Sequence, residues 1–302
     1  MHYAFDIGGS KLEFGVFNEK SKIVFHKKFP TPSKNRIIFI KLIKDLVDFA
    51  DYKFGISNNI GISVAGSLDP KTGYIISANI PVLTGWSLAQ ELSQILQKCI
   101  TIQNDTDCFA LSELHTRYAN KYKTIFAITL GTGVGGSLII NGKLMSGKSG
   151  IIGEWGHGNN LCGQLSQYGL RSIICGCGKF GCLDSWGGAR GLENIYSQIY
   201  NKTLSSIDIT RLWHQGDLQC DRCIKIFIDL IAQELAFIIN ILDPEYIPVG
   251  GSLALEKKLI DKIDDQVRNK LLRSYQDKPI IIPGNHCSNG SLRGASLLYT
   301  TS

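Results

Sequence analysis

The segment Tyr3–Phe17, YAFDIGGSKLEFGVF, predicts two β-strands joined by a tight, glycine-rich turn. The apolar residues 3–5 begin the first strand, and the alternating residues 12–17 form the second. The turn exposes backbone N–H groups beside the hydroxyl of Ser10, and such concavities bind phosphate oxygens. One turn of this kind is not specific, because glycine-rich hairpins are common.

A second turn of the same kind lies in the middle of the chain. Residues 130–136, LGTGVGG, follow the apolar strand Ile125–Thr129 and lead into the strand Ser137–Ile140, with the hydroxyl of Thr132 nearby. Neither turn has the P-loop pattern, and neither leads directly into a helix as a dinucleotide fingerprint does. The pair, one in each half of the chain, predicts a duplicated α/β fold with two phosphate-binding turns.

Between the two turns, residues 104–107 (NDTD) follow a predicted strand at 99–103 and open a predicted helix at 108–114. One interpretation is a helix N-cap, in which Asp105 or Thr106 accepts backbone N–H bonds. The other interpretation makes Asp105 a general base at the end of a strand, where α/β folds place their sites. The position between two phosphate-type turns favours the base.

Four potential metal ligands follow the second turn: His157, Cys175, Cys177 and Cys182. One imidazole and three thiolates can complete a closed tetrahedral zinc site. Glycines between the cysteines permit the tight turns that three converging sulfurs need. Glu154, three residues before the histidine, would be held beside the metal, where it could bind a hydroxylated ligand. The alternative is a structural zinc site with an unrelated glutamate.

Together these features resemble the ROK family (repressors, open reading frames, kinases) over essentially the whole chain. The Gly153–His157 segment with the three cysteines is specific to this family, whereas the two turns alone would indicate only the wider actin/hexokinase-like superfamily. Further matching segments are Gly61–Gly66, Ala78–Pro81, Asp243–Glu245, Gly250-Gly251 and Leu292–Ala295.

The resemblance implies a two-lobed actin/hexokinase-like fold (ribonuclease H-like and duplicated) with a cleft between the lobes. Residues 1–118 would form a small α/β lobe joined by a C-terminal helix at 290–302, and residues 119–289 a large α/β lobe with the zinc knuckle. The implied activity is ATP-dependent phosphorylation of N-acetyl-D-glucosamine to its 6-phosphate, with ATP, magnesium and structural zinc. Glucose, mannose or fructose stay open as substrates, and so does a catalytically weak sugar-binding relative. A repressor would carry a helix-turn-helix before the first turn.

The resemblance also implies a role for individual residues, with Asp105 accepting the proton of the attacking sugar hydroxyl. The implied ATP-binding residues are Ala4, Phe5, Asp6, Ile7, Gly8, Gly9, Ser10, Lys11, Gly131, Thr132, Gly133, Val134, Gly135, Gly136 and Ser137. The implied sugar-binding residues are Gly66, Asn79, Asn104, Asp105, Glu154, His157 and Asp184. Asp184 stands where relatives usually carry glutamate. We expect Asp184 to lie in the part of the sugar site that the metal holds in place, and not at the phosphate-binding turns.

Composition fits a cytoplasmic enzyme. The 302 residues, 44% apolar and 19% charged, can form two compact domains. No signal peptide is predicted at the start. Residues 224–242 form the most apolar window but carry Lys225, Asp229 and Glu234, which predicts a buried core helix and no membrane span. The net charge of +6 is spread without a dense basic run, so no nucleic-acid partner is expected. The expected partners are ATP and a small sugar, and a homodimer is an assembly that the resemblance allows.

Overall fold

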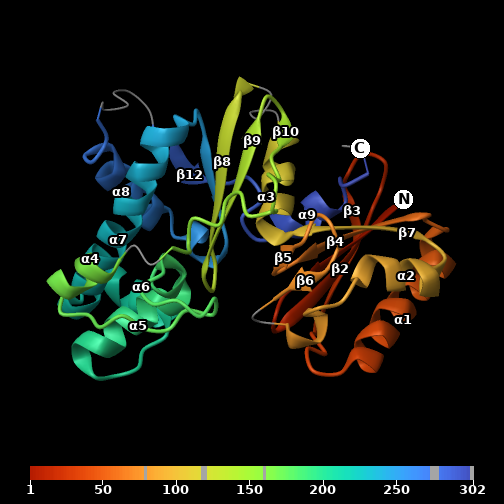
Figure 1. Cartoon of the computed structure of the whole chain (residues 1–302), viewed down its shortest axis with the longest axis horizontal. Coiled ribbons are helices and arrows are strands. Elements are labelled where there is room, and N and C mark those ends of the chain that lie inside the picture. Colours follow the sequence, from red (N-terminus) through yellow and green to blue (C-terminus); the bar gives the residue numbers. More distant parts are fainter. Residues whose placement is uncertain (78–79, 117–120, 159–160, 273–278, 300–302) are drawn as a thin grey trace. The chain divides into compact units, whose positions relative to one another are not determined.

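The computed structural model describes the chain except for residues 78–79, 117–120, 159–160, 273–278 and 300–302 (Figure 1). The chain divides into two compact units, and each contains one five-stranded mixed sheet. The first unit comprises Met1–His115, Ser146–Ile152 and Asn289–Ser302, and the second comprises Thr116–Met145 and Gly153–Ser288. The boundary that the sequence suggests, between residues 118 and 119, lies outside the described residues.

The sheet of the first unit contains the predicted hairpin and has the strand order β3-β2-β1-β4-β7. β1, β2 and β3 form an antiparallel meander, and β4 and β7 follow parallel to β1. The glycine-rich turn joins β1 to β2, where Ile7 pairs with Leu12, so the predicted hairpin is confirmed. The strands are β1 His2–Ile7, β2 Lys11–Phe17, β3 Ile23–Pro30, β4 Asn59–Val64 and β7 Cys99–Asn104, with a small ribbon of β5 Ser67–Leu68 and β6 Ile75–Ile76.

Different helices cover the two faces of this sheet. On one face the large residues Tyr3, Phe5 and Phe14 are fully buried in a core shared with α1 (Arg36–Phe54) and α2 (Leu88–Leu96). On the other face Gly15 and Gly61 lie where α9 (Gly290–Ala295) approaches closely, while larger residues such as Glu13 and Phe17 share the same face. A Cβ on Gly61 would lie only 1.8 Å from the Ala295 carbonyl oxygen. The glycines at these two positions therefore allow α9 to cover this face.

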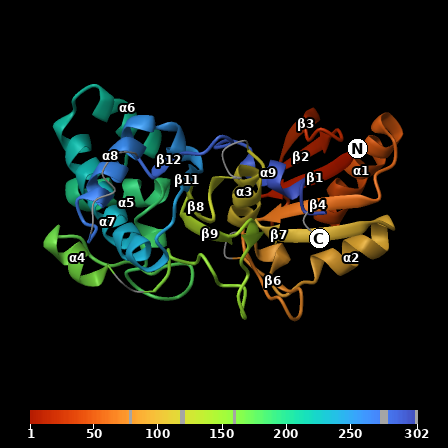
Figure 2. The same cartoon turned by 90° about the horizontal axis from the view of Figure 1, so that it is seen from above.

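A second close approach joins α9 to α3 (Asp105–Leu114), and the two helices lie side by side (Figures 1 and 2). A Cβ on Gly294 would lie 1.6 Å from the Cys108 carbonyl oxygen, so only glycine fits there. Cys108 is buried at this contact, whereas Cys99 is exposed at the start of β7. The close fit holds α3, and therefore its N-terminus, against the sheet.

The sheet of the second unit repeats the strand order of the first. β8, β9 and β10 form an antiparallel meander, and β11 and β12 follow parallel to β8, in the order β10-β9-β8-β11-β12. The predicted duplicated α/β fold is therefore confirmed. The strands are β8 Thr124–Leu130, β9 Val134–Ile140, β10 Lys143–Leu144, β11 Ile247–Gly250 and β12 Ile281–Pro283.

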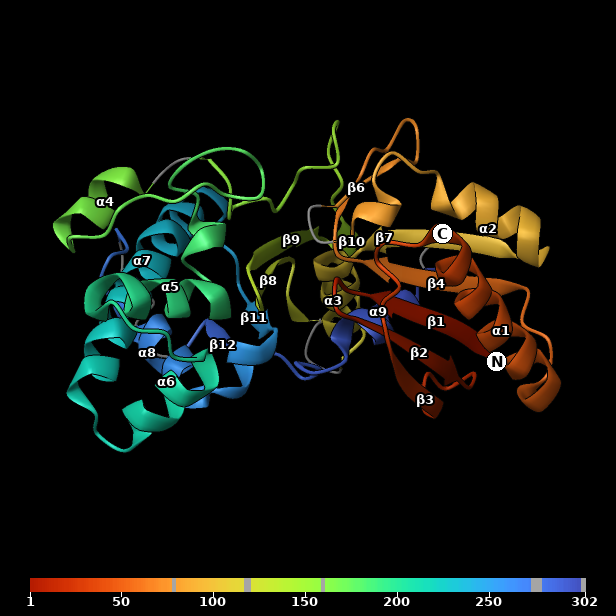
Figure 3. The same cartoon turned by 90° about the horizontal axis from the view of Figure 1, so that it is seen from below.

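Helices α5 to α8 pack together in the second unit (Figure 3). The predicted helix at 224–242 is longer than expected and begins at Leu218, because Asp217 caps its N-terminus by accepting the N–H bonds of Gln219 and Cys220. Along the described residues, no helix combines the length and apolarity that a bilayer crossing requires. The helices are α4 Cys162–Gln167, α5 Ala189–Tyr200, α6 Ser206–His214, α7 Leu218–Leu242 and α8 Lys257–Arg268.

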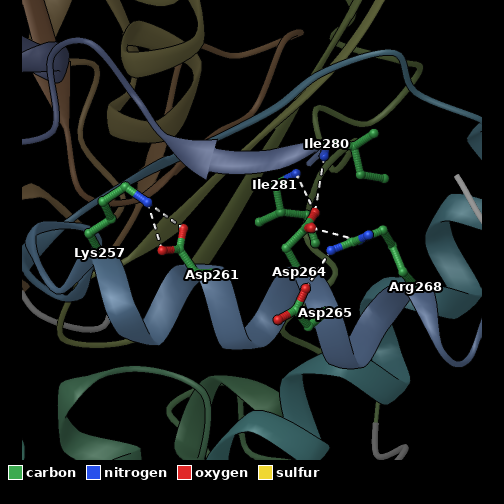
Figure 4. A network of polar contacts seen from close by, with 7 residues as sticks. All are labelled: Lys257, Asp261, Asp264, Asp265, Arg268, Ile280 and Ile281. Atoms are coloured by element: carbon green, nitrogen blue, oxygen red, sulfur yellow. Dashed lines mark hydrogen bonds and ion pairs between the residues drawn. The ribbon is translucent and has the colours of Figure 1, made fainter. Parts of the chain in front are cut away.

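One buried carboxylate attaches α8 to the sheet (Figure 4). Asp264, 1% exposed, accepts the backbone N–H bonds of Ile280 and Ile281 at 3.0 Å each. Its second oxygen accepts a bond from Arg268 Nε at 2.8 Å. A buried charge is tolerated when it is paired and hydrogen-bonded in this way. The contact fixes the outer strand β12 beside β11.

Candidate active site and metal centre

The first glycine-rich turn is held from one side by the end of β3. The Gly8 N–H donates to the Lys11 carbonyl at 2.9 Å, which closes the turn. Thr31 then donates twice, from Oγ1 to the Gly8 carbonyl at 2.7 Å and from its N–H to the Ser10 carbonyl at 3.2 Å. Within the described residues the Gly9 and Ser10 N–H groups have no acceptor. The turn carbonyls are thus engaged while amide donors remain available for an anionic ligand.

A continuous polar row crosses the first sheet immediately before this turn. Residues paired directly across neighbouring strands share a face, and here the row runs through Lys28, Glu13, Asp6, Ser63 and Gln103. Sequence reasoning identified only Asp6 in this row. The signal that was available is the alternation of β2, which puts Glu13 on the polar face and Leu12 and Phe14 on the apolar one.

Glu13 is the hub of the row. Its carboxylate is 2% exposed and accepts bonds from Lys11 Nζ at 2.5 Å and His26 Nε2 at 2.7 Å, with Lys28 Nζ at 3.2 Å. Burial acts to raise the Glu13 pKa, but the bonds from Lys11, His26 and Lys28 outweigh it and hold the pKa below its usual range. Glu13 therefore stays ionised and binds basic side chains next to the turn.

Two carboxyls in the first unit have raised pKa values. Ser63 Oγ donates to Asp6 Oδ1 at 2.7 Å. Burial raises the Asp6 pKa to about 6, against the lowering effect of the Ser63 bond and with a further rise from the Glu13 charge. Burial, followed by the charge of Asp6, raises the Asp105 pKa to about 7. A carboxylate with a pKa near neutrality is suited to accept a proton in a reaction at physiological pH.

The N-cap residue of α3 is Asn104, whose Oδ1 accepts the N–H bonds of Thr106 at 2.8 Å and Asp107 at 3.3 Å. Asp105 Oδ1 also accepts the Thr106 N–H at 2.8 Å, so the expectation that Asp105 accepts a backbone N–H bond is confirmed, while the cap position itself is one residue earlier than expected. Asn104 Nδ2 donates to the Gly66 carbonyl at 3.0 Å, and a Cβ on Gly66 would lie 2.7 Å from the Ile76 carbonyl oxygen. The amide of Asn104 thus joins α3 to the loop after β4. Asn79, the remaining predicted sugar ligand of this unit, lies outside the described residues.

The four predicted metal ligands converge in the second unit. The donor atoms of His157, Cys175, Cys177 and Cys182 all lie within 4.8 Å of one another. His157 Nδ1 is 3.5 Å from Cys175 Sγ, and Cys177 Sγ is 3.6 Å from Cys182 Sγ. Ligands of a tetrahedral zinc ion, bound at about 2.0–2.3 Å, lie about 3.3–3.8 Å apart. The donor set and these two separations therefore fit zinc.

Glu154 and Cys175 Sγ lie against different nitrogens of the His157 ring. Glu154 Oε2 is 3.6 Å from His157 Nε2, while Nδ1 faces Cys175. A metal-bound histidine is commonly oriented by a carboxylate on its second nitrogen. Glu154 is 40% exposed, so its other lone pairs remain accessible to a polar ligand.

The second glycine-rich turn is held by segments distant in sequence. Its Gly131 carbonyl accepts the Ala189 N–H at 2.7 Å, at the start of α5. Val134 N–H donates to Asp184 Oδ1 at 2.9 Å. The expectation that Asp184 stands apart from the phosphate-binding turns is therefore wrong, because its carboxylate caps a backbone donor of one of them. Within the described part of the chain the Thr132 and Gly133 N–H groups have no acceptor.

Four of the predicted ATP-binding residues have fully buried side chains. Ala4, Phe5, Ile7 and Ser137 lie inside their sheets and are 0% exposed. Their side chains belong to the cores that hold the turns in place. The chemistry available to a ligand comes from the turn residues and from Asp6 and Lys11.

Comparison with known proteins places the chain in a family. The family model described as "ROK family" matches residues 2–302. The chain is 34% identical over 303 residues to N-acetyl-D-glucosamine kinase of Salmonella typhimurium, with both chains fully covered. It is 35% identical over 301 residues to N-acetyl-D-glucosamine kinase of Yersinia pseudotuberculosis, with 99% of each covered.

Solved structures share the fold over the whole length. The ROK hexokinase of Thermus thermophilus superposes with a TM-score of 0.82 at 25% identity, covering 98% of this chain and 96% of that one. A ROK family glucokinase of Streptomyces griseus, solved with glucose and AMPPNP, gives a TM-score of 0.84 at 24% identity, with 98% of each chain covered. Sequence and fold agree, and the chain belongs to the ROK family.

Proposed function

We propose that this chain transfers the terminal phosphoryl group of ATP to the 6-hydroxyl of N-acetyl-D-glucosamine. The observation that carries the proposal is the 34–35% identity, over the full length, to proteins named N-acetyl-D-glucosamine kinase. The local chemistry supports it, since the chain has two turns with available amide donors and a carboxyl whose pKa is about 7. The enzyme would act in the cytoplasm on two small molecules.

In this proposal Asp105 accepts the proton of the attacking hydroxyl. Asp6, a hard oxygen donor next to the first turn, would hold magnesium, which neutralises phosphate charge when bound. Lys11 and the amides of the two turns bind phosphate oxygens. Phosphoryl transfer needs little covalent assistance from a protein, so positioning and charge neutralisation account for most of the catalysis. The glucokinase solved with glucose and AMPPNP supports ATP as the donor.

We further propose that the sugar is bound by polar groups of both units, whose donors and acceptors can form further hydrogen bonds. In the first unit these are Asn104 and Asp105, with Gly66 supplying close backbone approach and Asn79 as a further ligand. In the second unit they are Glu154 and His157, which zinc would brace, together with Asp184 Oδ2. A site built from such hydrogen bonds discriminates strongly between hydroxyl patterns, because an unmatched buried polar group is costly.

A coupled assay of ADP release tests the proposal with four sugars: N-acetyl-D-glucosamine, glucose, mannose and fructose. We expect the highest kcat/KM on N-acetyl-D-glucosamine, by about tenfold or more, since the acetamido group adds hydrogen bonds of about 1.4 kcal/mol or more in total. Phosphorus NMR of the product should show a 6-phosphate. A higher kcat/KM on one of the other three sugars would reassign the substrate, and ADP release on none of them would leave a sugar-binding relative without catalysis.

Light scattering after gel filtration tests the assembly, for which we propose a homodimer. A mass of one chain would reject the dimer and leave the proposed reaction untouched.

A further inference from the structure

The second glycine-rich turn lies between two segments that both carry metal ligands. The first segment, residues 153–157, contains His157, and its Trp155 Nε1 donates to the Gly135 carbonyl at 2.9 Å. The approach is close, because a Cβ on Gly136 would lie 2.5 Å from the Gly153 carbonyl oxygen. One side of the turn is thus fixed by the chain that leads into the histidine ligand.

The second segment, residues 182–190, begins at the ligand Cys182 and holds the other side of the turn. Asp184 Oδ1 accepts the Val134 N–H at 2.9 Å, and a Cβ on Gly133 would lie 2.1 Å from the same oxygen. Further along this segment, Ala189 N–H donates to the Gly131 carbonyl at 2.7 Å and Arg190 N–H to the Thr132 carbonyl at 3.3 Å. Every one of these contacts lies within the second unit.

The two segments are also joined to each other. Asp184 N–H donates to the Gly156 carbonyl at 2.8 Å, and Asp184 Oδ2 lies 3.9 Å from Cys175 Sγ. Asp184 therefore contacts the turn, the histidine segment and the cysteine knuckle at once. The four ligands would hold the two segments together when zinc is bound, because His157 comes from one segment and Cys182 from the other.

We propose that Asp184 is a positioning residue for nucleotide, through which the zinc knuckle sets the shape of the second phosphate-binding turn. By fixing the Val134 amide, Asp184 leaves the Thr132 and Gly133 amides as the donors that face a phosphate. This inference deepens the proposed kinase function and rests on it, since it takes the turn to be a nucleotide-binding element. It assigns the metal centre an effect on the nucleotide and not on the sugar alone.

Isothermal titration of Mg-ADP, without sugar, tests the proposal on three variants of the full chain. Asp184→Ala removes the acceptor and should weaken ADP binding about tenfold or more, the effect of losing a hydrogen bond to a charged group. Asp184→Asn retains an oxygen acceptor, so its Kd for Mg-ADP should stay within about threefold of the wild-type value. Asp261→Asn makes the same chemical change at an exposed carboxylate on α8 and should bind like wild type.

The metal arm uses wild-type protein stripped with a chelator, with circular dichroism to verify folding and metal analysis to verify loss. ADP binding should weaken about as much as in Asp184→Ala and return on adding zinc, whereas Asp184→Ala should retain about one zinc per chain, the content of a single four-ligand site. Wild-type ADP affinity in Asp184→Ala would overturn the proposal. So would equal losses in Asp184→Ala and Asp184→Asn. No ADP binding by wild type would overturn the kinase function as well, which separates the two failures.

Discussion

The two sheets have the same strand order, yet the positions beside their glycine-rich turns differ in chemistry. In the first sheet the paired residues one step before the turn are Glu13, Asp6 and Ser63. In the second sheet the same registers hold Gly135, Thr129 and Gly250. The first copy thus carries the charged groups, and the second carries none at these positions.

The turns also differ in what holds them. The first turn is fixed by Thr31, only two dozen residues away, through hydrogen bonds to Gly8 and Ser10. The second turn is fixed by Asp184 and by the start of α5, segments about fifty residues away that follow the metal ligands. The first half of this duplicated fold therefore carries buried carboxyl groups beside its turn, whereas the second half anchors its turn through segments that contain predicted metal ligands.

The comparison predicts that the largest effect on turnover comes from the first unit. Asp105→Asn should lower kcat about 10²–10⁴-fold, the usual contribution of a general base, while the protein stays folded. Asp107, two residues further along α3, offers a matched control. Asp107→Asn should change kcat by only a few-fold, and a loss as large as that of Asp105→Asn would show that the whole helix terminus, and not one carboxylate, is required.

A pH profile sharpens the same assignment. Because Asp105 has a pKa of about 7, it is protonated in more acid solution, and kcat/KM should fall about tenfold per pH unit below that value. A profile that is flat between pH 5 and pH 8 would contradict the role of a group with this pKa.

Stability should change with pH in the opposite sense. Folding favours the protonated form of Asp105, so its contribution to stability is fully present below its unfolded pKa near 4 and is lost as the pH rises to about 7. Asp105→Asn should therefore be more stable than wild type at pH 8, by about 4 kcal/mol for a pKa raised from near 4 to about 7, and nearly equal to it at pH 4. Thermal unfolding of both proteins across this range measures the difference.

A smaller effect tests the anion at the hub of the polar row. Glu13→Gln keeps the side-chain size but leaves Lys11, His26 and Lys28 without their shared carboxylate, and it turns an amide donor toward other donors. We expect a loss of about 1–3 kcal/mol in the free energy of unfolding, measured by urea denaturation. Glu19→Gln, at an exposed turn, should cost almost nothing. Equal stability of the two variants would mean that the row does not act as a unit.

The smallest expected effect concerns the anchoring of the first turn. Thr31→Val removes the bond from Oγ1 to the Gly8 carbonyl but keeps the backbone bond to Ser10. The KM for ATP should rise about two- to tenfold, which corresponds to one neutral hydrogen bond. Thr203→Val, at an exposed loop position, controls for the substitution itself. An unchanged KM would indicate that the hairpin alone fixes the turn.

Local patterns explain what could be predicted from the sequence. Glycine turns between apolar strands gave both hairpins, and closely spaced cysteines with a histidine gave the four converging ligands. Contacts that depend on strand register, or on segments that are distant in the sequence, could not be predicted. Glu13 joins Asp6 only because β2 pairs with β1, and Asp184 reaches Val134 across fifty residues. Helices α5 and α6 were also missed, because their stabilisation comes from packing against α7.

The central claim is that Asp105 serves turnover whereas Asp184 serves nucleotide binding. Its most direct test measures ADP affinity and turnover on the same two variants. Asp105→Asn should lose turnover while its Kd for Mg-ADP stays at the wild-type value. Asp184→Ala should show a weakened Kd for Mg-ADP, and its kcat at saturating ATP and sugar should fall far less than that of Asp105→Asn. If Asp105→Asn keeps its turnover, or if the two variants lose ADP affinity and turnover to the same extent, Asp105 and Asp184 do not have the separate roles that we propose.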